Sequence, residues 1–149
     1  MNETLARAIF DDQVRGLSER LLEFRGWTLF AKEYPVLDVG FAAEGREPLR
    51  VRFDCTGWNE KPASIKLLSL EGRRLTYVPL DTTGVINPGP HPISGRPFIC
   101  LPGSLEYHGH THHMTDKWEN YRGKDDFALG GILTKIWRTW EKTRGWARK

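Results

Sequence analysis

The chain has 149 residues, of which 39% are hydrophobic and 28% charged, and its formal net charge is +3. This length fits a single domain over 1–149, and the small net charge argues against nucleic acid as a partner. We also expect a cytoplasmic protein that does not enter the membrane, because no apolar run approaches the ~20 residues that a membrane helix needs and the opening MNETLARAIFDDQ is not typical of a secretory signal.

The first predicted element is a helix over residues ~3–25. Apolar residues recur there at helical spacing with charged residues between them. Asn2 is well placed to cap the first turn, and Gly26 is well placed to end the helix. The apolar residues with this spacing are Leu5, Ile9, Leu17, Leu21 and Phe24.

The period then changes to two, which predicts β-strands. The stretches 28–43 and 48–58 are strand-like, with the turn EGREP between them. Residues 63–70 are expected to form a third strand and residues 76–80 a short fourth one. Because these strands follow each other through short turns, they predict an antiparallel meander of four strands.

The remaining elements are a long loop, a short apolar segment and a helix. Residues 81–97 contain three glycines and four prolines, which is typical of a stiffened loop. The segment FICL (98–101) predicts a short strand or buried extended chain, and the histidine-rich segment after it is expected to be a loop. A helix is predicted from ~126 to ~142, with Asp125 or Asp126 as its cap. Together these elements predict an α+β fold.

Two cysteines are present, and we expect a reducing compartment without a disulfide. Cys100 follows the Pro/Gly-rich loop and precedes the histidines, so it is the candidate nucleophile. Its thiol needs neighbours that help form the thiolate. The alternative is a small buried hydrophobic residue between Ile99 and Leu101. Cys55 lies in an alternating strand segment and is expected to be structural.

Four histidines lie within residues 108–113, and they admit three interpretations. His108 and His110 are the first candidates for groups that act on Cys100 as cations or general bases. If the segment is extended, His108, His110 and His112 share one side and could bind zinc. The third interpretation is a mobile polar loop without chemistry. Asp116 follows the cluster and could orient one of the imidazoles.

Three further residues are candidates for positioning or binding. His91 is expected to hold the long loop by hydrogen bonds, in preference to a chemical role. Tyr107 and Trp118 stand on either side of the histidine cluster. For these two residues the alternative is packing or an exposed polar position.

Several motifs carry a resemblance to a known family. The segment HPISGRPFICL (91–101) resembles the His-Pro-Asn segment of ubiquitin-conjugating enzymes, which is followed by glycine and Ile-Cys-Leu. TGWNEKPASIKL (56–67) is similar to the proline-marked strand entry of that family. Trp118 and the helix around ILTKIW (132–137) fall where the family places a tryptophan and its following helix. The predicted order of elements resembles the family's order over most of the chain.

The resemblance implies a ubiquitin-conjugating (UBC-like) fold, with an N-terminal helix, a four-stranded antiparallel meander, a long active-site loop and a C-terminal helix. It also implies an acyl transferase in which Cys100 carries the C-terminal glycine of a protein as a thioester and transfers it to an amine. The implied protein substrate is a ubiquitin-like protein or a cyclic-oligonucleotide synthase, a nucleotidyltransferase of a bacterial anti-phage system. An activating enzyme is a further implied partner, and no cofactor is implied.

The sequence also departs from the family pattern. Ile93 occupies the place of the family asparagine that is credited with stabilising the oxyanion, so either the chemistry differs or another donor substitutes. Asp116 is similar to the acidic residues near the family cysteine that are thought to lower the pKa of an incoming lysine. Two alternatives remain: a zinc-dependent isopeptidase or hydrolase using His108, His110 and Asp116, and a non-catalytic relative that binds a ubiquitin-like tail.

Overall fold

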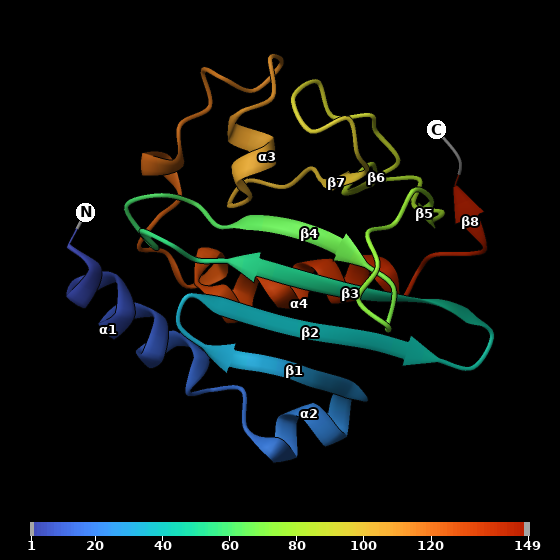
Figure 1. The fold of residues 1–149 in the computed structure, drawn as a ribbon, viewed down its shortest axis with the longest axis horizontal. Coiled ribbons are helices and arrows are strands. Elements are labelled where there is room, and N and C mark those ends of the chain that lie inside the picture. The colour runs from blue at the N-terminus through green and yellow to red at the C-terminus, as the bar shows by residue number, and fades with distance from the viewer. Residues whose placement is uncertain (1, 148–149) are drawn as a thin grey trace.

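The computed structural model describes residues 2–147 and contains a four-stranded antiparallel sheet with helices before and after it (Figure 1). The strands are β1 (Trp27–Glu33), β2 (Val36–Ala43), β3 (Arg46–Asp54) and β4 (Ser64–Leu68), which pair in chain order. The α+β class and the antiparallel meander of four strands are therefore confirmed.

The meander is built from other segments than predicted. The strand-like stretch 28–43 divides at the turn formed by Tyr34 and Pro35, and Glu33 pairs with Val36 across that turn. Proline has no N–H to donate to a ladder, which favours a turn at this point. The short fourth strand expected at 76–80 is absent from this sheet.

The segment expected to be the fourth strand pairs elsewhere. Residues Val78–Pro79 form β5, which pairs with β8 (Trp146–Ala147) near the end of the chain. Across residues 2–147, no helix is both long and apolar enough to span a membrane.

The predicted N-terminal helix is wrong in one respect, because it consists of two helices. They are α1 (Glu3–Val14) and α2 (Glu19–Arg25), and Gly16 lies in the turn that separates them. Glycine disfavours a helix interior. The hydroxyl of Ser18 then caps α2 by accepting a hydrogen bond from the Leu21 N–H (3.2 Å).

The predicted ends of this helical region are confirmed. The Asn2 side chain accepts a hydrogen bond from the Thr4 N–H at 2.8 Å and caps α1. Gly26 ends α2 in the left-handed conformation, with φ of 69°. Because the helix breaks, Leu5 and Phe24 do not share one buried face, and both are exposed.

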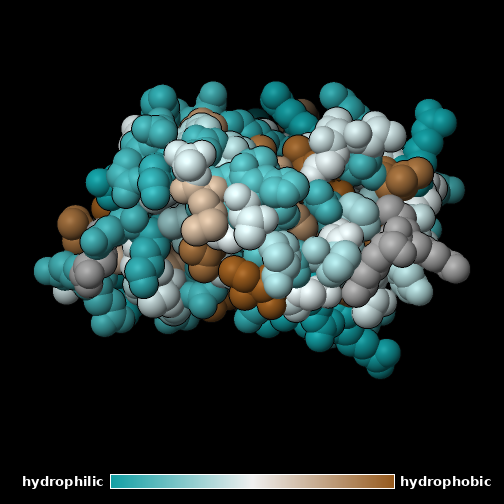
Figure 2. Space-filling view, turned by 90° about the horizontal axis from the view of Figure 1, so that it is seen from above, coloured by the Kyte–Doolittle hydropathy of each residue, from teal (hydrophilic) through white to brown (hydrophobic). Residues whose placement is uncertain are grey.

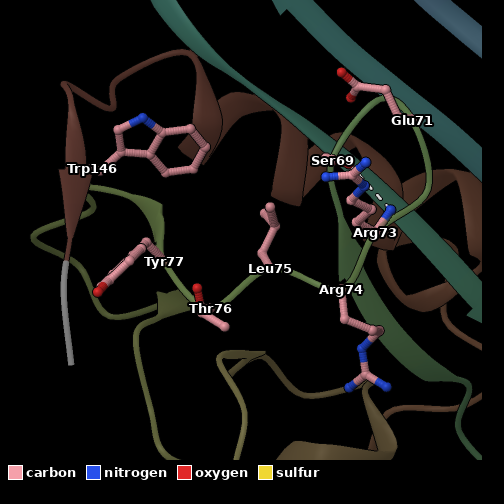
Figure 3. Close-up of a pocket in the computed structure, with 8 residues that line it drawn as sticks. All are labelled: Ser69, Glu71, Arg73, Arg74, Leu75, Thr76, Tyr77 and Trp146. Atoms are coloured by element: carbon pink, nitrogen blue, oxygen red, sulfur yellow. Dashed lines mark hydrogen bonds between the residues drawn. The ribbon is translucent and has the colours of Figure 1, made fainter.

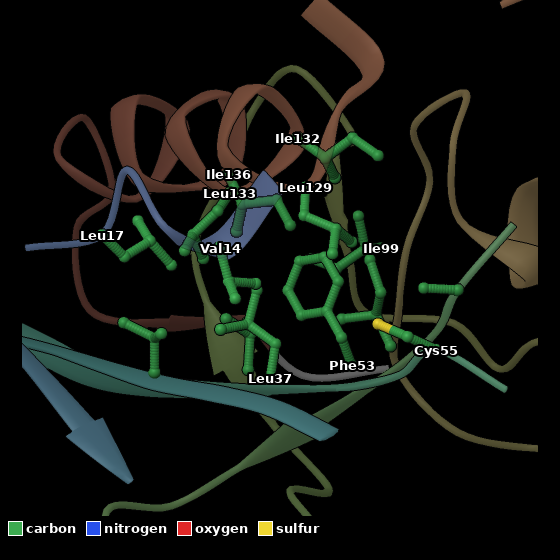
Figure 4. Close-up of a cluster of buried hydrophobic side chains, with 14 of the residues drawn as sticks. Val14, Leu17, Leu37, Phe53, Cys55, Ile99, Leu129, Ile132, Leu133 and Ile136 are labelled. Carbon is green, nitrogen blue, oxygen red and sulfur yellow. The ribbon is translucent and has the colours of Figure 1, made fainter. Parts of the chain in front are cut away.

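The C-terminal helix α4 (Leu129–Trp140) packs its apolar face against the inner face of the sheet (Figure 4). Alternate residues of β2 and β3 face this helix because side chains in a strand alternate between the two faces. The fully buried strand residues are Leu37, Val39, Phe41, Leu49, Val51 and Phe53, and the buried helix residues are Leu129, Ile132, Leu133, Ile136 and Trp140.

The predicted aspartate cap of α4 is wrong. Asp125 and Asp126 lie in the short helix η2 (Asp125–Phe127), and no side chain of the N-cap residue caps α4. The Leu129 N–H instead donates to the side-chain oxygen of Gln13 in α1 at 2.9 Å. A residue 116 positions away therefore supplies the cap, which local spacing does not reveal.

Short elements interrupt the segments predicted as irregular: a strand in the long loop, a helix at the start of the histidine segment and the helix η1 (Trp118–Asn120). Within the long loop, β6 (Ile86–Asn87) pairs with β7 (Phe98–Ile99), so the short apolar strand expected at FICL is confirmed for its first two residues. The histidine segment is not entirely a loop, because α3 (Leu105–His108) includes its first histidine. The Ser104 hydroxyl starts this helix by accepting the Tyr107 N–H (3.1 Å).

A buried ion network lies on the face of the sheet opposite α4. Asp38 of β2 is 1% exposed and accepts two hydrogen bonds from Arg50 and one from Arg52, each at 2.8 Å. Burial alone would raise the pKa of Asp38, but these hydrogen bonds outweigh it and lower the pKa below its usual value. The network therefore ties β2 to β3 through a charged carboxylate.

We predict that Asp38→Asn lowers the free energy of unfolding at pH 7 by about 3 kcal/mol, because the arginines lose their buried partner charge. The pKa of Asp38 is lower in the folded state than in the unfolded chain. The stability that Asp38 contributes to the folded protein is therefore fully present above its unfolded-state pKa, at about pH 4. It is lost as the pH falls through the lower pKa that Asp38 has in the folded protein. Urea unfolding at pH 7 and pH 3 measures this, with the exposed Asp11→Asn as control. Equal urea midpoints for Asp38→Asn and wild type at pH 7 would contradict the prediction.

Candidate functional site

Cys100 lies directly after β7, in the loop region beside β4, the outer strand of the sheet (Figure 1). Its N–H donates to the Val85 carbonyl at 2.7 Å, which fixes the backbone at this position. The side chain is half-buried, and this burial raises the pKa of the Cys100 thiol. Cys55, directly after β3, is fully buried, and burial raises the pKa of its thiol strongly. The two thiols are therefore in different environments, and Cys100 is the accessible one.

His113 is the imidazole next to Cys100, with its Nε2 atom 3.7 Å from the sulfur. Its ring stacks on the ring of Tyr107, with centroids 4.1 Å apart and an interplanar angle of 12°. His108 and His110 are the first helpers expected from the sequence, whereas His113 is the member of the cluster that lies next to the sulfur. The turns between residues 109 and 113 decide which histidine reaches the sulfur, and the sequence contains no signal for their path.

His108 points to the backbone instead of to Cys100. Its Nε2 accepts the Gly103 N–H at 3.0 Å, and its Nδ1 lies 2.8 Å from the Asp116 carbonyl. The carbonyl only accepts, so Nδ1 carries the proton and donates it, and the ring is neutral. Both ring nitrogens are thus occupied in hydrogen bonds with the backbone on either side of α3, at Gly103 before it and at Asp116 after it.

His110 packs within a group of rings. It stacks on Phe98 with centroids 5.8 Å apart and contacts the rings of His91 and His112. Burial, followed by the charges of the neighbouring imidazoles, lowers the pKa of His110. This histidine is therefore a packing group next to the site.

The histidine segment does not have the extended conformation in which alternate histidines share one side. It consists of α3 followed by successive turns, in which the His113 N–H donates to the His110 carbonyl at 2.9 Å. Within residues 2–147, no three histidine, cysteine or acidic side chains gather in an arrangement able to hold a metal ion.

Asp116 holds the tyrosine that stacks on His113. Its Oδ2 atom accepts hydrogen bonds from the hydroxyls of Tyr107 (2.5 Å) and Tyr121 (2.6 Å). These bonds lower the pKa of Asp116. Burial and the bond to Asp116 raise the pKa of Tyr107, so its hydroxyl stays protonated and keeps donating. Contacts therefore run from Asp116 through Tyr107 and His113 to Cys100.

His91 lies where it can hold the long loop, as expected from the sequence. Its Nε2 donates to the Glu106 carbonyl at 2.8 Å, and its Nδ1 accepts the Ile93 N–H at 3.1 Å. The Glu106 side chain accepts hydrogen bonds from the Ile65 N–H (2.9 Å) and the Ser64 hydroxyl (2.6 Å) of β4. Glu106 therefore joins the loop to the sheet, a role that nothing in the local sequence indicates.

Trp118 forms part of the support beneath the site. It is buried, its indole N–H donates to the Asn59 carbonyl at 2.9 Å, and its ring lies 5.7 Å from that of Trp58. Gly103 lies directly above this layer with φ of 106°, and a Cβ there would come within 2.8 Å of Ile132. Only glycine fits this turn between Cys100 and α3 without strain.

The surface over these loops is mainly hydrophilic, with hydrophobic residues in small separate patches (Figure 2). Ile93 is 79% exposed on the long loop and has no side-chain donor. It lies with Leu105 at the rim of a cavity of about 320 Å³. A side-chain oxyanion donor is therefore missing at this position.

Comparison with known proteins finds similarity only over part of the chain. Residues 81–143 match the model of the Y4jH-like family, described as the Y4jH family. The uncharacterized protein y4jH of Sinorhizobium fredii is 39% identical over 44 residues, which are 30% of this chain and 22% of that protein. The chain thus spans about a fifth of this relative's length. The family match covers Cys100, the histidines and α4, and it leaves out the four-stranded sheet.

We predict that Cys100 reacts with an aromatic disulfide reagent in the folded protein, while Cys55 reacts at least about 100-fold more slowly because only local unfolding exposes it. The rate at Cys100 should keep rising as the pH passes 8.5, the ordinary pKa of a thiol, because burial raises its pKa. Absorbance of the released thiol measures both rates. Cys55→Ser should keep the fast phase, and Cys100→Ser should remove it. A fast phase that survives in Cys100→Ser would contradict this.

Proposed function

We propose that this protein is a UBC-like conjugating enzyme that carries an acyl group on Cys100. The observation that supports this most directly is the accessible sulfur of Cys100 with an imidazole nitrogen of His113 at 3.7 Å. A thiol beside a base is the arrangement that nucleophilic cysteine chemistry requires. The order of helix, antiparallel meander, cysteine-bearing loop and helix also supports the proposal, because it resembles that of the ubiquitin-conjugating enzymes.

The proposed first step is an exchange of thioesters. His113 accepts the proton of the Cys100 thiol, and the sulfur attacks the carbonyl carbon of the donor thioester. The donor's carbon–sulfur bond breaks, and the leaving thiolate takes the proton that His113 accepted. Because burial raises the pKa of Cys100, the thiol is protonated at neutral pH and needs such a base. The resulting thiolate is also a strong nucleophile, since nucleophilicity falls as the thiol pKa falls.

The proposed second step transfers the acyl group to an amine. The amine nitrogen forms a bond to the carbonyl carbon and passes its proton to His113. The bond to the Cys100 sulfur then breaks, and His113 returns this proton to the sulfur. Ile93 supplies no side-chain donor to the oxyanion. We assign the missing stabilisation to the protonated His113, whose N–H lies beside the sulfur that carries the carbonyl.

The partners of this reaction follow from the resemblance alone. They are a protein with a C-terminal glycine, either a ubiquitin-like protein or a cyclic-oligonucleotide synthase of an anti-phage system, and an activating enzyme that loads Cys100. The proposal places this reaction in the cytoplasm, without a cofactor. The alternative of a zinc hydrolase is less favoured, because His108 would have to release two backbone hydrogen bonds to become a ligand.

A second candidate function is that of a non-catalytic relative that binds a ubiquitin-like tail. Ile93 favours it, because this exposed apolar side chain stands where the resemblance places a catalytic amide. In this case Cys100 would keep its accessibility but would not need to form a thioester. The conjugating enzyme would accept an acyl group on the Cys100 sulfur, whereas the binding protein would not need to.

We predict that Cys100 takes up the acyl group from a synthetic peptide whose C-terminal glycine is a thioester of mercaptoethanesulfonate, a donor that needs no activating enzyme. Intact mass spectrometry should show one peptide added per protein, removed by dithiothreitol. Cys55→Ser should load like wild type, and Cys100→Ser should form no dithiothreitol-sensitive adduct. His113→Ala should load about 100-fold more slowly through loss of the base, while the exposed His112→Ala should not.

The outcomes separate the two candidates. If the folded protein forms no adduct at Cys100 although the thiol reacts with small reagents, the conjugating function is wrong and the binding function remains. If His113→Ala loads at the wild-type rate, Cys100 remains the nucleophile but His113 is not its base.

A further inference from the structure

A hollow lies away from Cys100, between the turn that follows β4 and the strand β8 (Figure 3). It has a volume of about 480 Å³, and Arg73, Arg74, Leu75, Tyr77 and Trp146 contribute to its lining. We call this hollow the β4–β8 groove. It combines two guanidinium groups with two aromatic rings and one leucine, and none of these residues belongs to the site around Cys100.

Among residues 2–147, the guanidinium groups of the groove form no direct ion pair, and the carboxylate of Glu106 acts on Arg74 only at longer range. Neither Arg73 nor Arg74 forms a side-chain hydrogen bond or an ion pair within that part of the chain. Burial and the charge of Arg96 lower the pKa of Arg74, and the charge of Glu106 opposes this shift. Glu71 is the one acidic residue in the described lining. An anionic group in the groove would therefore be stabilised.

The backbone of the groove has an unpaired edge. The Ser69 N–H donates to the Arg73 carbonyl (2.8 Å) and the Leu75 N–H donates to the Leu67 carbonyl (3.0 Å), on either side of the bridge between Leu68 and Arg74. In an antiparallel pair with this pattern, the N–H and C=O of the middle residue point away from the partner strand. Accordingly, no backbone hydrogen bond of the described chain uses Arg74. The outer edge of residues 73–75 thus offers one donor and one acceptor to another strand.

The aromatic residues give the groove the composition of a protein-binding surface. Tyr77 is 45% exposed and Trp146 43% exposed, although both are large and partly apolar. Tyrosine, tryptophan and arginine are the residue types that dominate the binding energy of protein interfaces. Their side chains line the same hollow as the unpaired edge of Arg74 (Figure 3).

We propose that the β4–β8 groove binds an extended acidic segment of a protein partner. The segment adds a strand to the edge at Arg74 and places an apolar side chain against Tyr77 and Trp146. It places separate carboxylates on the guanidinium groups of Arg73 and Arg74, which extend to opposite sides of this edge (Figure 3). A nucleotide would match the cations and the rings but would leave the strand edge unused, so a peptide fits more of the features. This inference does not depend on the chemistry of Cys100.

A designed peptide tests the proposal. The probe is a fluorescein-labelled peptide in which pairs of aspartate or glutamate alternate with pairs of valine and phenylalanine, so that an extended peptide carries carboxylates on both faces. Fluorescence anisotropy measures its binding to the full chain. We expect binding that Arg73→Glu with Arg74→Glu weakens about tenfold or more. Arg122→Glu with Lys124→Glu is the matched control, because both residues are exposed and the change in net charge is the same. Circular dichroism establishes that both variants are folded.

Two further measurements locate the peptide. The indole N–H signal of Trp146, assigned with Trp146→Phe, should shift in the NMR spectrum when the acidic peptide binds. A peptide with N-methyl groups on alternate amides should bind more weakly if it pairs with the edge at Arg74.

Four results would overturn the proposal. They are the absence of binding by the acidic peptide, equal weakening by the control pair, equal binding of a peptide with lysine at the acidic positions, and ATP binding at the arginines without peptide binding.

Discussion

The geometry around Cys100 depends on one junction between the loop and the sheet, the hydrogen bonds of Glu106. Its carboxylate accepts the N–H of Ile65 and the hydroxyl of Ser64 in β4, while its carbonyl accepts the ring proton of His91. The long loop and the histidine segment contain little regular secondary structure, so backbone ladders cannot hold them. A few side chains that bind backbone groups provide the rigidity, and they place the sulfur at a fixed position above the core.

The histidines divide into residues that hold the backbone and one residue that faces the thiol. His91 and His108 each use both ring nitrogens in hydrogen bonds with the backbone. His110 is packed among other rings, and His113 alone of the four clustered histidines lies within hydrogen-bonding reach of Cys100. The support of His113 by Tyr107 and Asp116 explains how a turn without a regular ladder can present an imidazole to the sulfur.

The site around Cys100 and the β4–β8 groove differ in whether they lie in the segment that matches the Y4jH family. The segment that matches the Y4jH family, residues 81–143, contains Cys100 and all four clustered histidines. The β4–β8 groove is formed by residues 69–77 and Trp146, which lie outside that segment. The site around Cys100 is therefore in the shared part of the chain, whereas the proposed docking groove is not. Both the site and the groove are attached to β4. Glu106 joins the loop of the site to β4 through the Ile65 N–H, and the bridge between Leu68 and Arg74 joins the groove to it.

The sequence by itself determined the α+β class, the caps at Asn2 and Gly26 and the burial of the α4 face, because these depend on local spacing and on turn chemistry. It also singled out Cys100 and the histidine cluster. It did not distinguish the histidines, since the same side chain can bind a backbone group or face a thiol. Contacts between distant segments decided the roles of His113 and Glu106, the cap supplied by Gln13 and the pairing of β5 with β8. Such contacts arise only when the folded chain brings these segments together.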